Sequence, residues 1–345
     1  MNFRLESKKD AVFKRMIHEY IRSAKPVGSK IIAQKKGLDL SSATIRNYFA
    51  EFEDWGLVSQ PHPSAGRVPT DLGFRYYVNH LTRPAVYDEE SAAAVRGFFQ
   101  ETASDLENLT RQTPKILSQL SRQIGLLARP KLEGARLKEI HFLRLDAKRI
   151  LAIFIFQNEM VENRVLRNQA ELGGFDLHRL SNYLNQIGRG KTLLEVRNSL
   201  LDELKAQGRN QSQEMKRLWE LSEELIRSQT KPGLEIDGES NLANNPEFNQ
   251  PQKLEPVLKL LEDQRILLDL VDQSLSLSGV KVTIGSEHPY PEMRELAMIT
   301  TNYLNREGRP LGSIGIIGPK RIDYEKLISL VSCLARMISE YLRMH

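Results

Sequence analysis

Residues 40 to 77 read LSSATIRNYFAEFEDWGLVSQPHPSAGRVPTDLGFRYY and predict a helix followed by a β-hairpin. Ser41 and Ser42 can cap the helix, because a serine hydroxyl accepts a hydrogen bond from a backbone N–H left free in the first turn. Three large apolar residues then recur at helical spacing, namely Ile45, Phe49 and Phe52. Gly56 ends the helix, and residues 61 to 66 have turn composition between two short strands. The stretch therefore combines a helix that buries one side with a hairpin that projects as a wing.

Polar residues near the start of this helix lie largely off its apolar face: Ser42, Thr44, Arg46 and Asn47. When the N-terminal end of a helix enters the major groove of DNA, arginine can make two hydrogen bonds to guanine and asparagine two to adenine. Hydroxyl groups and free N–H groups suit phosphate oxygens. We therefore predict that Arg46 and Asn47 contact bases and that Ser41, Ser42 and Thr44 contact the backbone.

The tip of the predicted wing carries small residues, among them Ser64, flanked by His62 and Arg67. Small and basic residues allow close approach to a sugar-phosphate backbone. Upstream, an apolar stripe in residues 12 to 21 predicts one helix, and residues 30 to 36 predict a second. This order of helices and hairpin is typical of a winged helix-turn-helix. We predict phosphate contacts from His62, Ser64, Arg67 and, in the second helix, Lys30.

The basic excess of the chain lies entirely at its N-terminal end. Residues 1 to 83 hold 14 Lys and Arg against 8 Asp and Glu, a net charge of +6, whereas the remainder holds 35 against 36, or −1. Neutralisation of phosphates accounts for such an asymmetry. A small helical domain of any kind could contain the helix and hairpin, but the charge and the order of elements favour a DNA-binding domain over residues 1–83.

The same stretch resembles the signature of the bacterial heat-inducible transcription repressor HrcA family. The matching segments are residues 40–47, 56–57, 61–62, 64–67 and 69–70, and residues 161–165, 283–285 and 312–321 are similar to later family segments. The resemblance implies a GAF-like body that carries an inserted dimerising domain. It also implies an inverted-repeat operator upstream of chaperone operons, loss of activity on heating, and a chaperonin that assists the repressor into its active state.

A chain of 345 residues with 40% hydrophobic content is expected to form two or three domains. Thr70 can cap a helix from Asp71 to about Leu81. The patterns further predict one or two helices over residues 89–128 with Pro114 at their junction, an antiparallel meander over 140–166 and a helical insert over 176–227. A single helix is predicted from Pro256 to about Leu275, and three strands from 280 to 317 precede a helix that Asp323 caps. Together with the resemblance they predict an α+β fold in four segments. These are a winged helix-turn-helix (1–83), a first GAF-like part with linker helices (84–170), a mainly helical dimerising insert (171–231) and a second GAF-like part (232–345).

A homodimer is expected, because one winged helix contacts only a short half-site and two-fold symmetry doubles the contacts. The helices predicted over residues 176–227 carry more apolar surface than a segment of that size can bury within itself. We therefore predict that Leu200 and Trp219 contact the second copy. The helices predicted between residues 89 and 128 are the alternative location.

The sequence offers little that suits an enzyme or a cofactor site. Gly312, Gly315 and Gly318 have GxxGxxG spacing rather than that of a dinucleotide site, so we interpret them as strand and turn glycines. His288 is interpreted as a loop histidine, and Glu162-Asn163-Arg164 as a hairpin edge with a salt bridge. We expect no catalytic residues, no cofactor and no metal.

The chain has no apolar run of membrane-spanning length, no apolar core of a secretory signal near its N-terminus, and a single cysteine, Cys333. A cytoplasmic, DNA-binding transcriptional repressor is therefore the prediction. The alternative is a metabolite-responsive winged-helix regulator whose GAF-like domain binds a small molecule. A ligand that shifts the melting temperature would distinguish the two.

Overall fold

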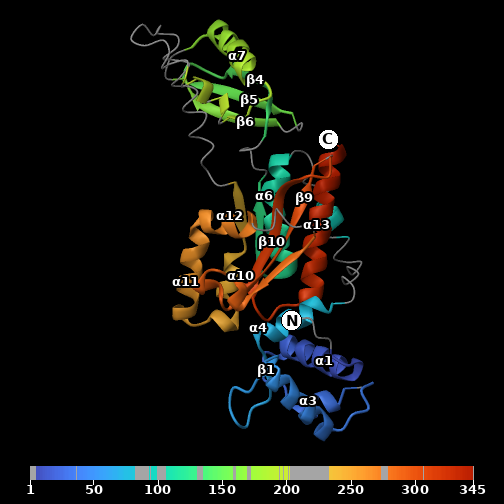
Figure 1. The fold of residues 1–345 in the computed structure, drawn as a ribbon. Coiled ribbons are helices and arrows are strands. Elements are labelled where there is room, and N and C mark those ends of the chain that lie inside the picture. Colours follow the sequence, from blue (N-terminus) through green and yellow to red (C-terminus); the bar gives the residue numbers. More distant parts are fainter. Residues whose placement is uncertain are drawn as a thin grey trace. The chain divides into compact units, whose positions relative to one another are not determined.

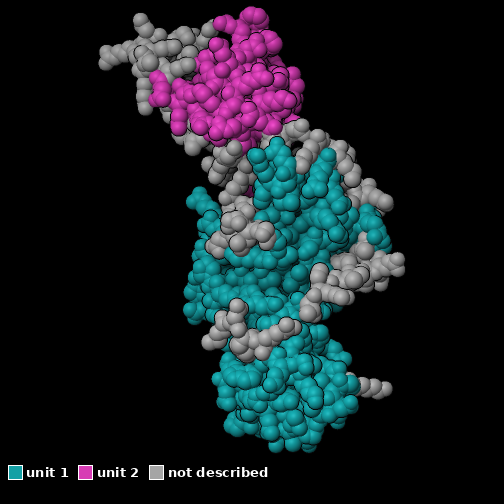
Figure 2. Space-filling model, turned by 45° about the vertical axis from the view of Figure 1, so that its right-hand side comes forward, with its two compact units in different colours: residues 1–129, 234–345 teal, residues 130–233 magenta. Residues whose placement is uncertain are grey.

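The structure is a computed structural model that describes residues 5–35, 37–81, 93, 95–98, 106–129, 135–157, 161–168, 172–193, 195–196, 198–200, 202, 233–272, 279–305 and 307–344. The chain forms two compact units, shown in different colours in Figure 2. The first contains residues 1–129 and 234–345, and the second contains residues 130–233. Both combine helices with antiparallel strands, as the predicted α+β class requires.

The first unit begins with a helix-hairpin segment, residues 5–81, drawn in blue and light blue in Figure 1. Its elements are α1 (Ser7–Ser23), α2 (Ser29–Ala33), α3 (Ser42–Asp54), β1 (Val58–Ser59), β2 (Val68–Pro69) and α4 (Asp71–Asn79). The predicted order of helices and hairpin is confirmed, but α2 is shorter than predicted and ends before residue 36. Its last turn tightens, because the N–H of Lys35 bonds to the carbonyl of Ile32, three residues back.

The caps predicted in this segment are present. Ser41 Oγ accepts the N–H of Thr44 at 3.1 Å at the start of α3, and Thr70 Oγ1 accepts the N–H of Gly73 at 3.0 Å at the start of α4. Apolar residues from α1, α3 and α4 form a common core: Val12, Phe13, Met16, Ile17, Ile45, Phe49, Phe52, Phe74 and Tyr77. Helix α3 is therefore backed by packed side chains along its whole length.

The rest of the first unit is a five-stranded antiparallel sheet of order β7-β3-β10-β9-β8 with helices on both faces (Figure 1). The strands are β3 (Ile124–Ala128), β7 (Leu234–Asp237), β8 (Lys281–Ile284), β9 (Leu296–Leu304) and β10 (Pro310–Pro319). One face is covered by α6 (Leu106–Ser121) and α13 (Tyr324–Met344), and the other by α10 (Glu239–Ala243), α11 (Pro251–Glu262) and α12 (Gln264–Asp272). The short helices η2 (Pro246–Phe248), η3 (Gly285–Glu287) and η4 (Pro291–Met293) lie in the connections.

Three predictions for this body are wrong. Residues 124–128 form β3 rather than the end of a helix, and all five are buried, so the strand lacks the alternation by which a strand is recognised. Pro114 lies inside α6 rather than between two helices. The single helix predicted from residue 256 is two helices, α11 and α12, because the Asp263 carboxylate accepts the N–H of Arg265 at 3.0 Å and caps a new start.

The second unit contains a separate antiparallel sheet of β4 (Leu137–Arg144), β5 (Arg149–Phe156) and β6 (Val161–Arg167). The predicted meander is thus confirmed, and α7 (Gly174–Gly188) packs on one of its faces. We expected the meander to belong to the GAF-like body and the insert to begin at residue 171. The structure instead divides near residue 130, because the apolar residues of the meander form their core with α7.

Candidate DNA interface

The predicted base-contacting residues lie on the open side of α3. Arg46 and Asn47 are exposed, whereas Ile45 between the turns is fully buried. The two helices that meet here are joined at their starts, since the hydroxyls of Ser29 and Ser42 lie 2.9 Å apart. This places the exposed Lys30 on α2 next to the N-terminal turn of α3. The arrangement presents an arginine, an asparagine, a lysine and several hydroxyls at the end of a firmly seated helix.

The three hydroxyl residues at the start of α3 predicted to contact the backbone already have hydrogen-bond partners, which for Ser42 is Ser29. Ser41 Oγ lies 3.0 Å from Thr44 Oγ1 in addition to accepting the N–H of Thr44. Ser41 remains exposed, whereas Ser42 and Thr44 are partly buried. A hydroxyl can donate to a phosphate while it accepts from an N–H, so this engagement orients the groups rather than removing them.

The tip of the hairpin is held in place by a residue that we did not single out from the sequence. The side-chain amide of Gln60 donates to the carbonyls of Pro63 and Ala65, at 2.8 and 3.0 Å. The N–H of Ala65 donates to the carbonyl of His62 at 2.8 Å. These bonds close the turn and leave His62 and Ser64 exposed at its tip. A glutamine just before a proline-rich turn was the available signal.

Arg67 occupies a different position from the one we expected. Its guanidinium is paired with Glu53 of α3 at 2.7 Å, and its backbone exchanges two 2.9 Å hydrogen bonds with Val27. The side chain is 18% exposed. Arg67 therefore ties the hairpin to α3 and to the segment before α2. A phosphate contact from this residue would have to compete with Glu53.

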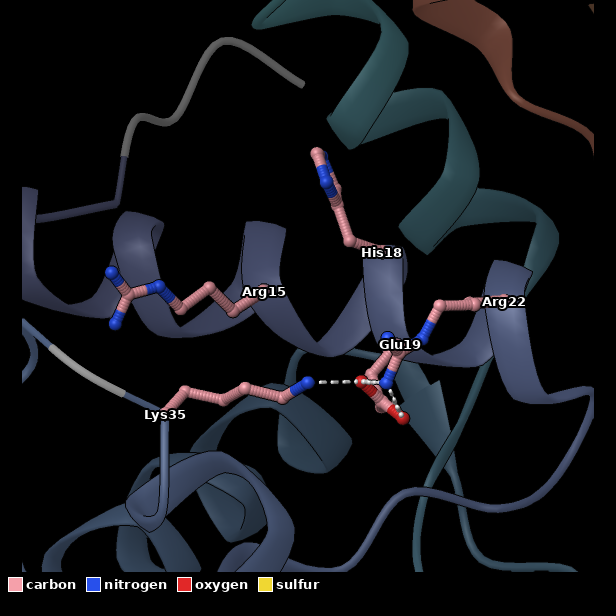
Figure 3. A pocket seen from close by; sticks show the side chains of 5 residues that line it. All are labelled: Arg15, His18, Glu19, Arg22 and Lys35. Carbon is pink, nitrogen blue, oxygen red and sulfur yellow. Dashed lines mark hydrogen bonds and ion pairs between the residues drawn. The ribbon is translucent and has the colours of Figure 1, made fainter.

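A cavity of about 340 Å³ on the same segment is lined by Arg15, His18, Glu19, Arg22 and Lys35. Figure 3 shows Lys35 and Arg22 directed at the Glu19 carboxylate, with the guanidinium of Arg15 pointing away from it. Glu19 pairs with Lys35 at 2.8 Å and with Arg22 at 3.1 Å. The hydrogen bond from Lys35, followed by that from Arg22, lowers the pKa of Glu19. Arg22 and Lys35 thus share one carboxylate, and with Arg15 they leave the lining of the cavity with a net positive charge.

The residues predicted to form a dimer contact are not presented on a surface that the structure describes. Leu200 is 2% exposed and lies in the core shared by α7 and the three-stranded sheet. Trp219 lies outside the described residues. The buried Leu200 side chain therefore stabilises the second unit itself rather than offering a surface to another copy.

The face of the three-stranded sheet opposite α7 is apolar and open. Leu143 on β4 and Val161 and Val165 on β6 are 53%, 56% and 59% exposed. They flank Leu151, Ile153 and Ile155 of β5, which are partly buried, while the exposed Arg149 and Asn163 lie on the same face. His141 and Glu139 are the polar residues of β4 on this face, 3.2 Å apart. Monomeric proteins rarely expose several large apolar side chains together on one face.

The remaining sequence interpretations concern residues outside the helix-hairpin segment. Gly312, Gly315 and Gly318 lie in β10, and a Cβ on any of them would come within 2.5 Å of a neighbouring strand or side chain, so they are packing glycines. Arg164 pairs with Glu162 on β6, as interpreted. His288 lies in the connection between η3 and η4, as interpreted, and its side chain is buried, with 6% of its surface exposed. Among the described residues, no group of three or more His, Cys, Asp or Glu is placed to hold a metal ion.

Within the part of the chain that the structure describes, no helix combines the length and the apolar character needed to cross a bilayer.

Comparison with known proteins gives a consistent result along the chain. The family described as HrcA protein C-terminal domain matches residues 107–328. A heat-inducible transcription repressor HrcA from Pelotomaculum thermopropionicum is 32% identical over 339 residues, which cover 98% of this chain and 97% of that protein. Another of the same name, from Xanthomonas campestris pv. campestris, is 34% identical over 323 residues, or 94% and 92% of the two chains. A solved structure described as a hypothetical protein superimposes with a TM-score of 0.70 at 23% identity and covers 99% of both chains, which shows a shared fold.

Proposed function

The chain belongs to the heat-inducible transcription repressor HrcA family, and we propose that it acts as a homodimer on an inverted-repeat operator. Proteins of this family repress transcription and are not enzymes. Repression then requires no chemistry, because a protein that occupies the operator excludes the transcription machinery from it. We place this activity in the cytoplasm, where bacterial DNA is found.

The observation that carries the proposal is the exposed N-terminal end of α3. Arg46 and Asn47 face outward on a helix whose other side is buried, and the exposed Lys30 lies close by. A winged helix-turn-helix would use these side chains in the major groove and its hairpin against the adjacent backbone. We propose base contacts from Arg46 and Asn47, and phosphate contacts from Lys30, Ser41, Ser42, Thr44, His62 and Ser64.

Arg67 has two possible parts in this interface, and the Glu53 pair favours one of them. A guanidinium already bonded to a carboxylate at 2.7 Å gains little from a nearby phosphate unless the pair breaks. We propose that Arg67 holds the wing against α3 and so sets the angle at which the wing meets the backbone.

The open face of the three-stranded sheet supports a second copy of this chain as the partner. Two-fold pairing places a patch against itself, so it requires a surface that is apolar or self-complementary in charge. Leu143, Val161 and Val165 meet the first condition, and the paired Glu139 and His141 meet the second. We therefore propose that this face lies in the dimer contact, in addition to any contribution from the undescribed part of the insert. The five-stranded body corresponds in this proposal to the GAF-like domain.

The operator proposed from the family is the inverted repeat upstream of chaperone operons, with heat relieving repression and a chaperonin restoring active protein. Nuclease footprinting of the purified protein on the upstream regions of its own genome's chaperone operons tests this. We expect two protected half-sites related by dyad symmetry, protection that heating abolishes, and faster recovery with chaperonin. The Arg46→Ala, Asn47→Ala double variant is the control, and protection that survives in it would count against the assigned interface.

A further inference from the structure

We propose that four charged residues at the junction of α4 with the sheet body are positioning residues for operator recognition. They are Asp71 and Arg75 on α4, and Glu287 and Lys320 on the body. They fix the direction of α3 relative to the body, so that a dimer accepts only one spacing between half-sites. The proposal rests on the dimeric function proposed above and adds to it the source of spacing selectivity.

The first contact of this junction is made by the Asp71 carboxylate. It accepts the N–H of Ser286 at 2.8 Å and pairs with Lys320 Nζ at 2.9 Å. Gly285 has φ +52°, and a Cβ there would lie 2.3 to 2.6 Å from the atoms of the Asp71 carboxylate. Only glycine combines that backbone conformation with so close an approach. The contact with Asp71, more than 200 positions earlier in the chain, therefore requires glycine at position 285.

The second contact is made by Arg75, one turn further along α4. Its Nε donates to Glu287 Oε1 at 2.6 Å, and a second guanidinium nitrogen pairs with the other carboxylate oxygen. The same Nη2 donates to the carbonyl of Val282 on β8 at 2.6 Å. Glu287 is itself fixed, because it accepts the N–H of Ile284 at 2.8 Å. A two-pronged arginine–carboxylate pair constrains direction as well as distance.

Apolar and backbone contacts complete the junction. Tyr324 at the start of α13 is fully buried, with its ring centroid 5.8 Å from that of Phe74 and 6.4 Å from that of Tyr77, both on α4. Away from α4, Arg321 Nη1 donates to the carbonyl of Ile21 near the end of α1 at 2.6 Å. The helix-hairpin segment is therefore attached to the body at two separated points, which restricts rotation about either one.

The restraint reaches α3 through the core of the segment. Phe13 of α1 contacts Phe52 of α3 and Tyr76 of α4, with ring centroids 5.3 and 5.4 Å apart. Lys9 of α1 also pairs with Glu51 of α3 at 2.6 Å. With α3 rigid on α4, and α4 held by the charged junction, the position of α3 on the body is defined. In a symmetric dimer this position is one of the determinants of the distance between the two recognition helices, which operator half-sites must match.

The test is a series of operators with identical half-sites whose central spacer is shortened or lengthened by up to about five base pairs, half a helical turn. The full chain is compared with Glu287→Gln, Lys320→Met and the double variant, in each case by equilibrium binding to the spacer series and to a single half-site. Lys320→Arg is the conservative variant. Lys259→Met removes an exposed ion pair on α11, a helix that carries none of the four junction residues, and is the matched control.

We expect the wild type, Lys320→Arg and Lys259→Met to bind the operator with the preferred spacing about tenfold or more tightly than the other operators. At a wrong spacing the second half-site is no longer held at high effective concentration near the second recognition helix. In the double variant this ratio should fall to about threefold or less, with single half-site affinity unchanged. A variant that weakens binding to every spacing by the same factor, or that keeps the wild-type ratio, would overturn the positioning role. A wild type that binds the repeat no better than one half-site would instead overturn the dimeric function.

Discussion

Acidification should destabilise the first unit through His288, and the size of the effect follows from the structure. His288 is 6% exposed, and burial holds its pKa at about 4, against an ordinary value of 6.5, with the neighbouring Thr283 backbone and Glu287 opposing this shift only in part. A depressed histidine pKa means that the unfolded chain takes up the proton first. The contribution of the neutral His288 to the unfolding free energy is therefore fully present above pH 6.5 and is lost as the pH falls toward 4.

The difference in proton uptake between pH 7 and pH 4 corresponds to about 3 kcal/mol of unfolding free energy. The assay is urea unfolding of wild type and His288→Phe at several values of pH in this range, followed by circular dichroism. Other groups titrate in both proteins, among them Asp71, so the measured quantity is the difference between their pH dependences. His178→Phe, which removes an exposed histidine on α7, is the control.

Between pH 7 and pH 4 the unfolding free energy of the wild type should fall by about 3 kcal/mol more than that of His288→Phe. It should fall by the same amount in the wild type and in His178→Phe. Since the absolute stability of His288→Phe depends on how the new ring packs, only the slope with pH is diagnostic. Parallel pH dependences of wild type and His288→Phe would refute the reasoning and would place the imidazole in contact with water.

Arg46→Ala and Asn47→Ala should each weaken operator binding by about 1 to 3 kcal/mol and change base preference, and a base-substitution series would show equal losses on all DNA if the two residues contacted only the backbone. Lys30→Ala should reduce the slope of log affinity against log salt by about one unit. Arg67→Ala should leave that slope nearly unchanged, and its effect on affinity should be coupled to that of Glu53→Gln in a double-mutant cycle. A lower slope in Arg67→Ala would show that Arg67 does contact a phosphate directly. Val165→Asp should shift sedimentation from dimer to monomer while Phe175→Asp, which alters a 76% exposed residue on α7, should not, and unchanged sedimentation of Val165→Asp would locate the dimer contact elsewhere.

Local signals in the sequence were sufficient for the helix-hairpin segment. Ser41 and Thr70 each cap the helix that their position predicts, and the Ile45, Phe49 and Phe52 stripe is buried as its spacing requires. These features depend on residues within one or two helical turns. The prediction for residues 124–128 was wrong for the opposite reason. The strand β3 is buried on both faces, so its sequence has no alternating pattern, and its strand partners lie far along the chain.

In the candidate interface, too, local features could be predicted from the sequence and long-range contacts could not. Exposure of Arg46 and Asn47 follows from helical spacing alone. The pairing of Arg67 with Glu53 does not, since two opposite charges 14 positions apart meet only when the hairpin folds back on α3. The contact of Asp71 with Lys320 spans 249 positions and had no local signal at all. The burial of Leu200 likewise depends on the sheet that packs against its helix.

The most direct test of the account is an equilibrium titration of the inverted repeat upstream of a chaperone operon against a fragment in which one half-site is scrambled. At physiological salt we expect two chains per intact repeat, and about a thousandfold or greater preference for it over random DNA. The scrambled fragment should bind far more weakly, and the preference should disappear in Arg46→Ala, Asn47→Ala. Equal affinity for the intact repeat, the scrambled fragment and random DNA would contradict a sequence-specific dimeric repressor.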